Sequence, residues 1–231
     1  MKRILLLFVF LVSSCVTNIF QTKEVISAPD NSLAYRSTVL LYVDDPDGGK
    51  IVASGFAYDE NHIMTAGHFC VSALEIQIFK SHKEDIRMKY YDEDMDIKTR
   101  YHLEIEEMSR VEDLCTLRLV GHDLPPLKII DDYDTVKIRD NVTIIGAPSG
   151  VAIGEFYGNV MALDYDGFGP KEIQNMLVVS APATGGVSGS PIILDKTGEV
   201  IGVLVRGHIY FDHLSFGVNG KKIKEFLNGL K

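Results

Sequence analysis

Basic side chains and long apolar runs are both scarce in this sequence. Its 231 residues include 23 lysines and arginines against 32 aspartates and glutamates, which gives a formal net charge of −9. An acidic chain repels a phosphate backbone, so nucleic acid is not an expected partner. Beyond residue 12, no apolar stretch reaches the roughly 20 residues that a helix needs to cross a bilayer.

Sequence patterns typical of metal sites are also missing. The most acidic segment, Asp92-Glu93-Asp94-Met95-Asp96, lacks the glycine and the terminal glutamate of an EF-hand loop. Weak calcium binding is one interpretation of this segment, and a solvated charged loop is the favoured one. We therefore expect no metal and no other cofactor.

The N-terminus, in contrast, is strongly apolar. Lys2 and Arg3 precede the apolar run Ile4–Val12, which is too short to span a bilayer but suits the core of a secretory signal peptide. Val12-Ser13-Ser14-Cys15 resembles a bacterial lipobox, which implies cleavage before Cys15 and lipidation of its thiol. The alternative is a plain signal peptide that is cut nearby. Both interpretations predict export, and the lipobox predicts a lipid anchor at Cys15 that holds the protein to the periplasmic or extracellular face of the cell envelope.

Only three cysteines are present. If Cys15 carries a lipid, Cys70 and Cys115 remain as a pair. In an oxidising compartment this pair can form a disulfide, and the alternative is two buried free thiols.

Short β-type runs separated by turn residues dominate the chain after residue 32. Residues 1–15 are predicted to be the signal segment and residues 16–32, which are polar and turn-forming, a tether. Leu124-Pro125-Pro126-Leu127 breaks the series near its midpoint, so residues 33–125 and 126–231 are predicted to be two domains. Such a series favours an all-β sandwich or barrel architecture.

The runs predicted as strands are Thr38–Val43, Lys50–Tyr58, Ile63–Thr65, Leu74–Phe79, Tyr101–Met108, Leu114–Val120, Asp140–Gly146, Gly154–Leu163, Met176–Ala181, Pro191–Leu194, Glu199–Val205 and Leu214–Val218. The charged stretch Ser81–Lys98 is expected to be a solvated loop or an exposed hairpin. Lys221–Leu230 has apolar side chains at helical spacing and predicts an amphipathic C-terminal helix.

Three segments could carry chemistry. Met64-Thr65-Ala66-Gly67-His68 places a histidine just after an apolar strand, Glu112-Asp113-Leu114 places an aspartate at the start of another, and Thr184–Pro191 is rich in glycine around Ser188. Each motif is weak alone, but histidine, aspartate and serine in this order are one arrangement in which a catalytic triad recurs. The other six histidines follow no such strand end. Glu112 is a rival to Asp113.

Three motifs resemble those of trypsin-like serine proteases: Thr65-Ala66-Gly67-His68, Asp113-Leu114-Cys115-Thr116-Leu117 and Gly186-Val187-Ser188-Gly189-Ser190-Pro191. Thr184–Pro191, followed by Gly198-Glu199-Val200-Ile201-Gly202, is most similar to the bacterial glutamyl-endopeptidase and HtrA-like branch. The resemblance implies an all-β fold of two six-stranded Greek-key β-barrels with a C-terminal helix. It implies that the first barrel carries the histidine and aspartate and the second the serine.

The resemblance also implies a role for each residue. Ser188 would be the nucleophile, His68 the base that takes its proton and Asp113 the group that orients the imidazole. The backbone N–H groups of Gly186 and Ser188 would form the oxyanion hole. The residues that would contact the substrate, an extended peptide or protein segment, are Pro182, Ala183, Thr184, Val205, Arg206 and Gly207. Since Cys70 and Cys115 each lie two residues past a proposed triad member, they would lie near each other if those members meet.

Several departures from the family bear on activation and specificity. Val187 stands where many members have aspartate or asparagine, so activation through a newly cleaved N-terminus is not implied. Pro182 stands where tryptic enzymes have aspartate, and Leu204 lies near the position of a histidine in glutamyl endopeptidases. A preference for an apolar or small side chain is therefore expected, rather than one for lysine, arginine or glutamate.

Two other functions stay open. One is a non-catalytic peptide-binding module on the same fold, against which the intact histidine, aspartate and serine argue. The other is an esterase. The strand predicted at Pro191–Leu194 argues against it, because in an esterase with a strand–elbow–helix pattern a helix would follow the nucleophile. The expected function is an exported serine endopeptidase that works through an acyl-enzyme.

Overall fold

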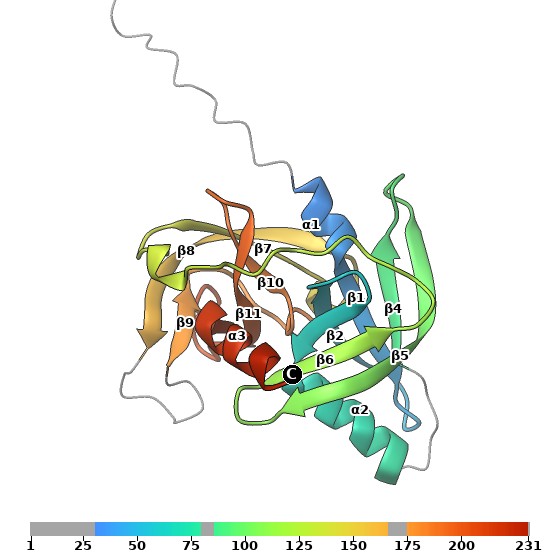
Figure 1. Cartoon of the computed structure of the whole chain (residues 1–231). Helices are drawn as coiled ribbons and strands as arrows, with labels where there is room; N and C mark the ends of the chain where they lie inside the picture. Colours follow the sequence, from blue (N-terminus) through green and yellow to red (C-terminus); the bar gives the residue numbers. More distant parts are fainter. Residues whose placement is uncertain (1–30, 80–85, 166–174, 231) are drawn as a thin grey trace, which may run out of the picture. The chain divides into compact units, whose positions relative to one another are not determined.

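Two closed β-barrels of six antiparallel strands each make up the part of the chain that the computed structural model describes, residues 31–79, 86–165 and 175–230 (Figure 1). This architecture confirms the expected all-β fold of two six-stranded barrels. The predicted signal segment 1–15 and most of the predicted tether 16–32 lie outside the described residues, and the domain boundary at 125/126 stays a prediction.

The first barrel has the strand order β1-β2-β3-β6-β5-β4 and closes where β1 pairs with β4. Its strands are β1 (Thr38–Asp44), β2 (Lys50–Ala57), β3 (His62–Ala66), β4 (Ile86–Tyr91), β5 (Ile97–Ser109) and β6 (Leu114–Leu119). Because β3 pairs with β6 rather than with β4, the end of β3 lies beside the start of β6. This register decides where the histidine and aspartate motifs meet.

The second barrel has the strand order β10-β11-β12-β9-β8-β7 and closes where β10 pairs with β7. Its strands are β7 (Asn141–Gly146), β8 (Gly154–Tyr165), β9 (Met176–Val179), β10 (Pro191–Leu194), β11 (Glu199–Gly207) and β12 (Ser215–Asn219). The element directly after Ser188 is therefore a strand, β10, as predicted, and not a helix.

Three clusters of buried apolar side chains hold this arrangement together. Each barrel has its own interior, with residues such as Leu41 and Leu117 in the first and Ile144 in the second. The third cluster combines Phe56 and Met64 of the first barrel with Val203, Phe216 and others of the second. The two barrels thus share an apolar interface, and burial of this interface fixes how their loops face one another.

Helix α2 (Gly67–Phe79) replaces the strand predicted at Leu74–Phe79. The prediction was wrong because the alternation of Leu74, Ile76 and Ile78 suggested a period of two. The buried side chains of this segment are instead Phe69, Cys70, Ala73 and Ile76, and their spacing of three to four residues is that of one helix face. The helix packs against the interior cluster of the first barrel.

The second correction concerns the charged stretch Ser81–Lys98, whose residues 81–85 lie outside the described part. Ile86–Tyr91 is a barrel strand, β4, rather than a solvated loop or an exposed hairpin. Ile86, Met88 and Tyr90 face the interior, with a charged residue between each pair. This is the period of two expected of a half-buried strand, and the surrounding charge obscured it.

Helix α3 (Gly220–Gly229) confirms the predicted C-terminal helix. The Asn219 side chain caps it by accepting a hydrogen bond of 3.0 Å from the Lys222 backbone N–H. A short helix, α1 (Ser32–Ser37), precedes β1. Each helix in the described part of the chain is too short or too polar to cross a membrane.

Candidate active site

The register between β3 and β6 brings His68 and Asp113 together. Ala66, the last residue of β3, pairs with Leu114, the first residue of β6. The two motifs then extend from adjacent strand ends, and the Gly67 N–H donates to the Asp113 carbonyl at 2.9 Å. A Cβ at Gly67 would lie only 2.8 Å from the Ser109 carbonyl oxygen, so the close approach of the two segments requires glycine here.

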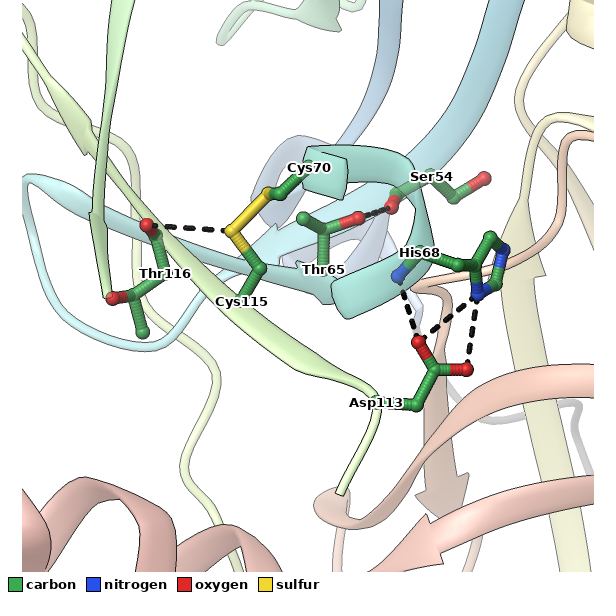
Figure 2. Close-up of a disulfide and its surroundings, with 7 residues drawn as sticks. All are labelled: Ser54, Thr65, His68, Cys70, Asp113, Cys115 and Thr116. Carbon is green, nitrogen blue, oxygen red and sulfur yellow. Dashed lines mark hydrogen bonds and ion pairs between the residues drawn. A yellow bond between two sulfur atoms is a disulfide. The ribbon is translucent and has the colours of Figure 1, made fainter. Parts of the chain in front are cut away.

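Asp113 holds the His68 side chain through two kinds of hydrogen bond (Figure 2). The His68 backbone N–H donates to Asp113 Oδ1 at 2.7 Å, and the ring Nδ1 lies 3.1 and 3.0 Å from Oδ1 and Oδ2. Glu112, the rival candidate, instead accepts a hydrogen bond from the Ser109 hydroxyl. Asp113 is therefore the carboxylate that faces the imidazole. The other ring nitrogen of His68, Nε2, is left for another partner.

Charge favours the ionised form of Asp113. Burial raises the pKa of its carboxyl, but the hydrogen bonds and charge of His68, together with the Arg206 guanidinium, outweigh burial and leave the pKa below its ordinary value. The carboxylate is thus available at neutral pH to orient the imidazole and to stabilise a positive charge on it.

A disulfide between Cys70 and Cys115 joins the segments that carry His68 and Asp113 a second time (Figure 2). It connects α2 to β6 with Cα atoms 6.5 Å apart, and both sulfurs are fully buried. Of the two alternatives that the sequence leaves open, the structure has the disulfide rather than free thiols.

The turn that carries Ser188 is held against the first barrel by main-chain contacts. The Ser54 N–H of β2 donates to the Ser188 carbonyl at 2.8 Å. At Gly189, where φ is +89°, a Cβ would lie 2.0 Å from the Ser54 carbonyl oxygen and 2.4 Å from Thr65 Oγ1. Only glycine fits this approach, and it places the turn against Thr65, three residues before His68.

The Ser188 side chain itself does not bond to the imidazole here. Its hydroxyl is half-buried and lies 3.4 Å from the Val205 carbonyl oxygen, a long and weak hydrogen bond. In the described part of the chain, Ser188 Oγ has no other hydrogen-bond partner.

Ser54 is a residue that sequence reasoning missed. Its buried hydroxyl donates to the Gly186 carbonyl at 2.8 Å and accepts from the Ala147 N–H at 2.9 Å. Its own carbonyl accepts from Thr65 Oγ1 at 2.7 Å (Figure 2). One small side chain of the first barrel thereby fixes two loops of the second. No sequence signal marks it, because a serine in an apolar strand has no motif around it.

The backbone N–H groups of Gly186 and Ser188 have no acceptor within the described residues. The Gly185 carbonyl accepts from the Ser149 N–H at 2.6 Å and the Val187 carbonyl from the Ser190 N–H at 3.0 Å. In a trans peptide the N–H points opposite to the C=O, so these bonds turn the Gly186 N–H away from Ser149 and the Ser188 N–H away from Ser190. Unsatisfied, oriented donors of this kind suit an anion.

The residues predicted to contact substrate lie next to this turn. Ala183 packs on Gly207, where an added Cβ would be 3.1 Å from Ala183 Cβ, and Pro182 is half-buried beside it while Thr184 is exposed. β10 pairs only with residues 199–203 of β11. Arg206 and Gly207 pair with β12 on one side, so their other edge is open to an added strand. Val205 sits at the register shift between Leu204 and Arg206, and its side chain is buried.

A cavity of about 470 Å³ adjoins the imidazole. Its lining residues are His68, Val71, Arg110, Val111, Asp113, Met176 and Arg206. Among the residues that the structure describes, no group of three histidine, cysteine, aspartate or glutamate side chains could hold a metal ion.

Comparisons with known proteins agree with this geometry. No curated protein sequence matches the chain. Among solved structures, Deg5 is similar with a TM-score of 0.69 and 20% identity over 87% of this chain and 91% of that chain. The HtrA-type protease AlgW, solved with a tripeptide, has a TM-score of 0.68 and 18% identity over 87% of this chain and 62% of its own. These low identities establish a shared fold only.

The family is established by sequence. A family model for a trypsin-like peptidase domain matches residues 53–203, more than half of the chain, and this span includes His68, Asp113 and Ser188. The chain belongs to the trypsin-like peptidase family.

Proposed function

We propose that this protein is an active serine endopeptidase in which Ser188 is the nucleophile, His68 the general base and Asp113 the orienting carboxylate. One observation carries the proposal: the hydrogen-bonded His68–Asp113 pair belongs to the same barrel as Ser54, whose backbone and side chain hold the Ser188 turn. This attachment supports the proposal that the three side chains act together at one end of the interface between the barrels.

The chemistry follows from these positions. His68 Nδ1 faces Asp113, so Nε2 is the nitrogen that would take the proton from Ser188 Oγ as the oxygen attacks a peptide carbonyl. The negative charge that develops on the carbonyl oxygen would be met by the Gly186 and Ser188 N–H groups. His68 would then return the proton to the leaving amine, and water would hydrolyse the acyl-enzyme by the same route.

The proposal requires Ser188 Oγ to leave the Val205 carbonyl and donate to His68. The 3.4 Å contact that it must give up is weak. Hydrogen bonds in active sites without substrate are often long and tighten only in the complex.

Labelling with a fluorophosphonate probe and peptide hydrolysis together test the nucleophile. Ser188→Ala should abolish both, and His68→Ala should lower both by roughly 10³-fold or more. Ser32→Ala, which removes an exposed hydroxyl on α1, is the matched control and should retain wild-type labelling. Full hydrolysis by Ser188→Ala would contradict the assignment.

A second candidate function, a non-catalytic peptide-binding module, is favoured by the Ser188 hydroxyl pointing to Val205 rather than to His68. It predicts that folded wild-type protein binds extended peptides at the open edge of β11 without cleaving them and without reacting with the probe. Probe labelling of wild-type protein would rule this candidate out.

We propose in addition that the protein is exported and anchored by a lipid on Cys15. The support is the sequence Lys2–Cys15, with its basic start, apolar run and lipobox-like end. Incorporation of radiolabelled palmitate by the full chain in a bacterial host, and its loss in Cys15→Ala, is the expected result. A Cys15→Ala protein that is still labelled would contradict lipidation at this residue.

A further inference from the structure

The cavity beside His68 combines charged side chains with apolar walls. We propose that it is a substrate subsite for an acidic side chain, with Arg110 and Arg206 as the groups that bind the carboxylate. The inference rests on the proposed function and names the class of substrate that the site would take. It adds to the expectation of an apolar or small residue at the scissile bond.

The first argument is that neither arginine is paired with a carboxylate in the described part of the chain. Arg110, in the turn between β5 and β6, and Arg206, at the end of β11, are both exposed and form no ion pair within the described residues. Several other basic side chains in the described part of this acidic protein are paired with carboxylates. Lys128 lies 2.8 Å from Asp131 and 2.7 Å from Glu199, and Lys196 lies 2.7 Å from Asp140. Two guanidinium groups that form no ion pair within the described residues line one cavity and make it locally positive.

The second argument concerns Asp113, the only carboxylate among the described residues that line the cavity. An acidic ligand would be repelled by a free carboxylate there, but both Asp113 oxygens are engaged by the His68 ring and the His68 backbone N–H. Among the described lining residues, two arginines oppose one aspartate, so this part of the cavity carries a net positive charge. Arg110 also borders a neighbouring hollow with Glu107 and Glu112, without an ion pair to either in the described structure.

The third argument is shape. Val71, Val111 and Met176 supply apolar walls between the arginines and His68. The methylene groups of a glutamate can lie on such walls while its carboxylate reaches a guanidinium, which binds carboxylates with two parallel hydrogen bonds. A volume of about 470 Å³ is ample for one side chain.

Strand geometry assigns the position in the substrate. A peptide that adds to the open edge of β11 at Arg206 and Gly207 has side chains that alternate between opposite sides. The residue whose carbonyl is attacked would face Ala183, which packs on Gly207. The residue before it would then face the opposite side, toward His68 and the cavity. The acidic residue is therefore expected immediately before the residue at the scissile bond.

Matched peptide substrates test the proposal. In the coumarin amides acetyl-Ala-Ala-Xaa-Yaa, Yaa is Ala, Val or Leu and Xaa is Glu or its neutral isostere Gln. We expect wild-type kcat/KM to be about 10-fold higher with Glu than with Gln. Arg206→Gln and Arg110→Gln should each reduce this ratio, and the double variant should bring it close to one. Lys137→Gln removes a positive charge that does not line the cavity and should leave the ratio unchanged.

The outcomes separate the subsite from the proposed activity. If the wild-type protein reacts with the fluorophosphonate probe and cleaves both peptides equally, the subsite is wrong and the protease assignment stands. If nothing is cleaved, the protease assignment fails. Fluorescence anisotropy of labelled Glu and Gln peptides on Ser188→Ala then tests the subsite alone. Equal affinity for the two peptides would overturn it, and tighter binding of the Glu peptide that is lost in the Arg206→Gln background would support it.

Discussion

Ser54 shows how much a single buried hydroxyl can organise in this site. It contacts Gly186 and Ala147 through its side chain and Ser188 through its backbone, although Gly186 lies 132 residues away in sequence. Without it, the Gly186 carbonyl and the Ala147 N–H would be buried without a partner. The peptide group that links Gly186 to Val187 would also lose its anchor. At the scale of residues, the orientation of the proposed oxyanion hole therefore depends on the first barrel.

Ser54→Ala is expected to lower both stability and reactivity. Loss of two hydrogen-bond partners in a buried setting costs about 1–3 kcal/mol, and misorientation of the turn should slow probe labelling by roughly 10-fold or more. Ser37→Ala is the matched control, because the buried Ser37 hydroxyl also has two partners, the Leu33 carbonyl oxygen at 2.8 Å and the Pro125 carbonyl oxygen at 2.5 Å, and neither belongs to the proposed site. Urea unfolding and labelling rates measure the two effects. Equal labelling rates for both variants would show that Ser54 is merely structural.

Asp113 predicts a pH dependence of stability. Its pKa is lower in the folded protein than its ordinary value of 3.8, so its contribution to stability is present above that value and is lost as pH falls through the folded-state pKa. The free energy of unfolding of wild type should therefore exceed that of Asp113→Asn near neutral pH, and the difference should shrink toward about pH 3. Urea unfolding between pH 7 and pH 3 measures it, with the exposed Asp123→Asn as control. A difference that does not change with pH would contradict the argument.

Among the elements, the pairing of β3 with β6 and the start of α2 form one unit. The two strand ends present His68 and Asp113, and the disulfide Cys70–Cys115 closes the same segments two residues further along each chain. The histidine is thus held between a strand and a cross-linked helix rather than on an open loop. Such support matters, because a proposed base must be oriented within a few tenths of an ångström to be effective.

Removal of the disulfide should loosen this unit. The bridge joins residues 45 apart, and the chain-entropy model then gives about 4 kcal/mol of stabilisation. The double variant Cys70→Ala/Cys115→Ala should lower the melting temperature and should lower kcat more than it raises KM, since the imidazole loses constraint while the open edge of β11 is untouched. A variant with unchanged melting temperature and unchanged kcat would show that the hydrogen bonds alone hold the pair.

On the scale of the whole molecule, the apolar interface between the barrels sets the site. Phe56 and Met64 lie on the two strands next to the Ser188 turn and are fully buried against the second barrel's side chains. The barrels therefore cannot shift independently without exposing this cluster. The distance from His68 to Ser188 is a property of that interface and not of either barrel alone.

Phe56→Ala tests the interface directly. Truncation of a fully buried phenylalanine typically costs about 3–5 kcal/mol, and here it should also reduce probe labelling because the two halves of the site lose their common support. Ile209→Ala, at a position with an exposed fraction of 83%, should change the free energy of unfolding by less than about 0.5 kcal/mol. A Phe56→Ala protein that is destabilised but labels at the wild-type rate would show that the interface does not align the site.

Local pattern was a good guide wherever one face of a segment alone decides its structure. Apolar spacing accounts for the strands around Thr38–Val43 and Pro191–Leu194. The helix after Asn219 follows from its apolar spacing and from its capping residue. The prediction failed at Leu74–Phe79, where the buried face involves Phe69 and Cys70 outside the window that suggested a strand. It also failed at Ile86–Tyr91, where charged neighbours masked the alternation.

The sequence by itself determined the all-β class, the C-terminal helix and the three motifs around His68, Asp113 and Ser188, because these depend on residues close together in the chain. Only the tertiary structure decided that Asp113 rather than Glu112 faces His68 and that Cys70 bonds to Cys115. It also decided that Ser54 fastens the Ser188 turn and that two arginines share a cavity with the imidazole. These contacts join residues many tens of positions apart. Strand register and the packing of one barrel on the other bring them together, and neither leaves a local signature in the sequence.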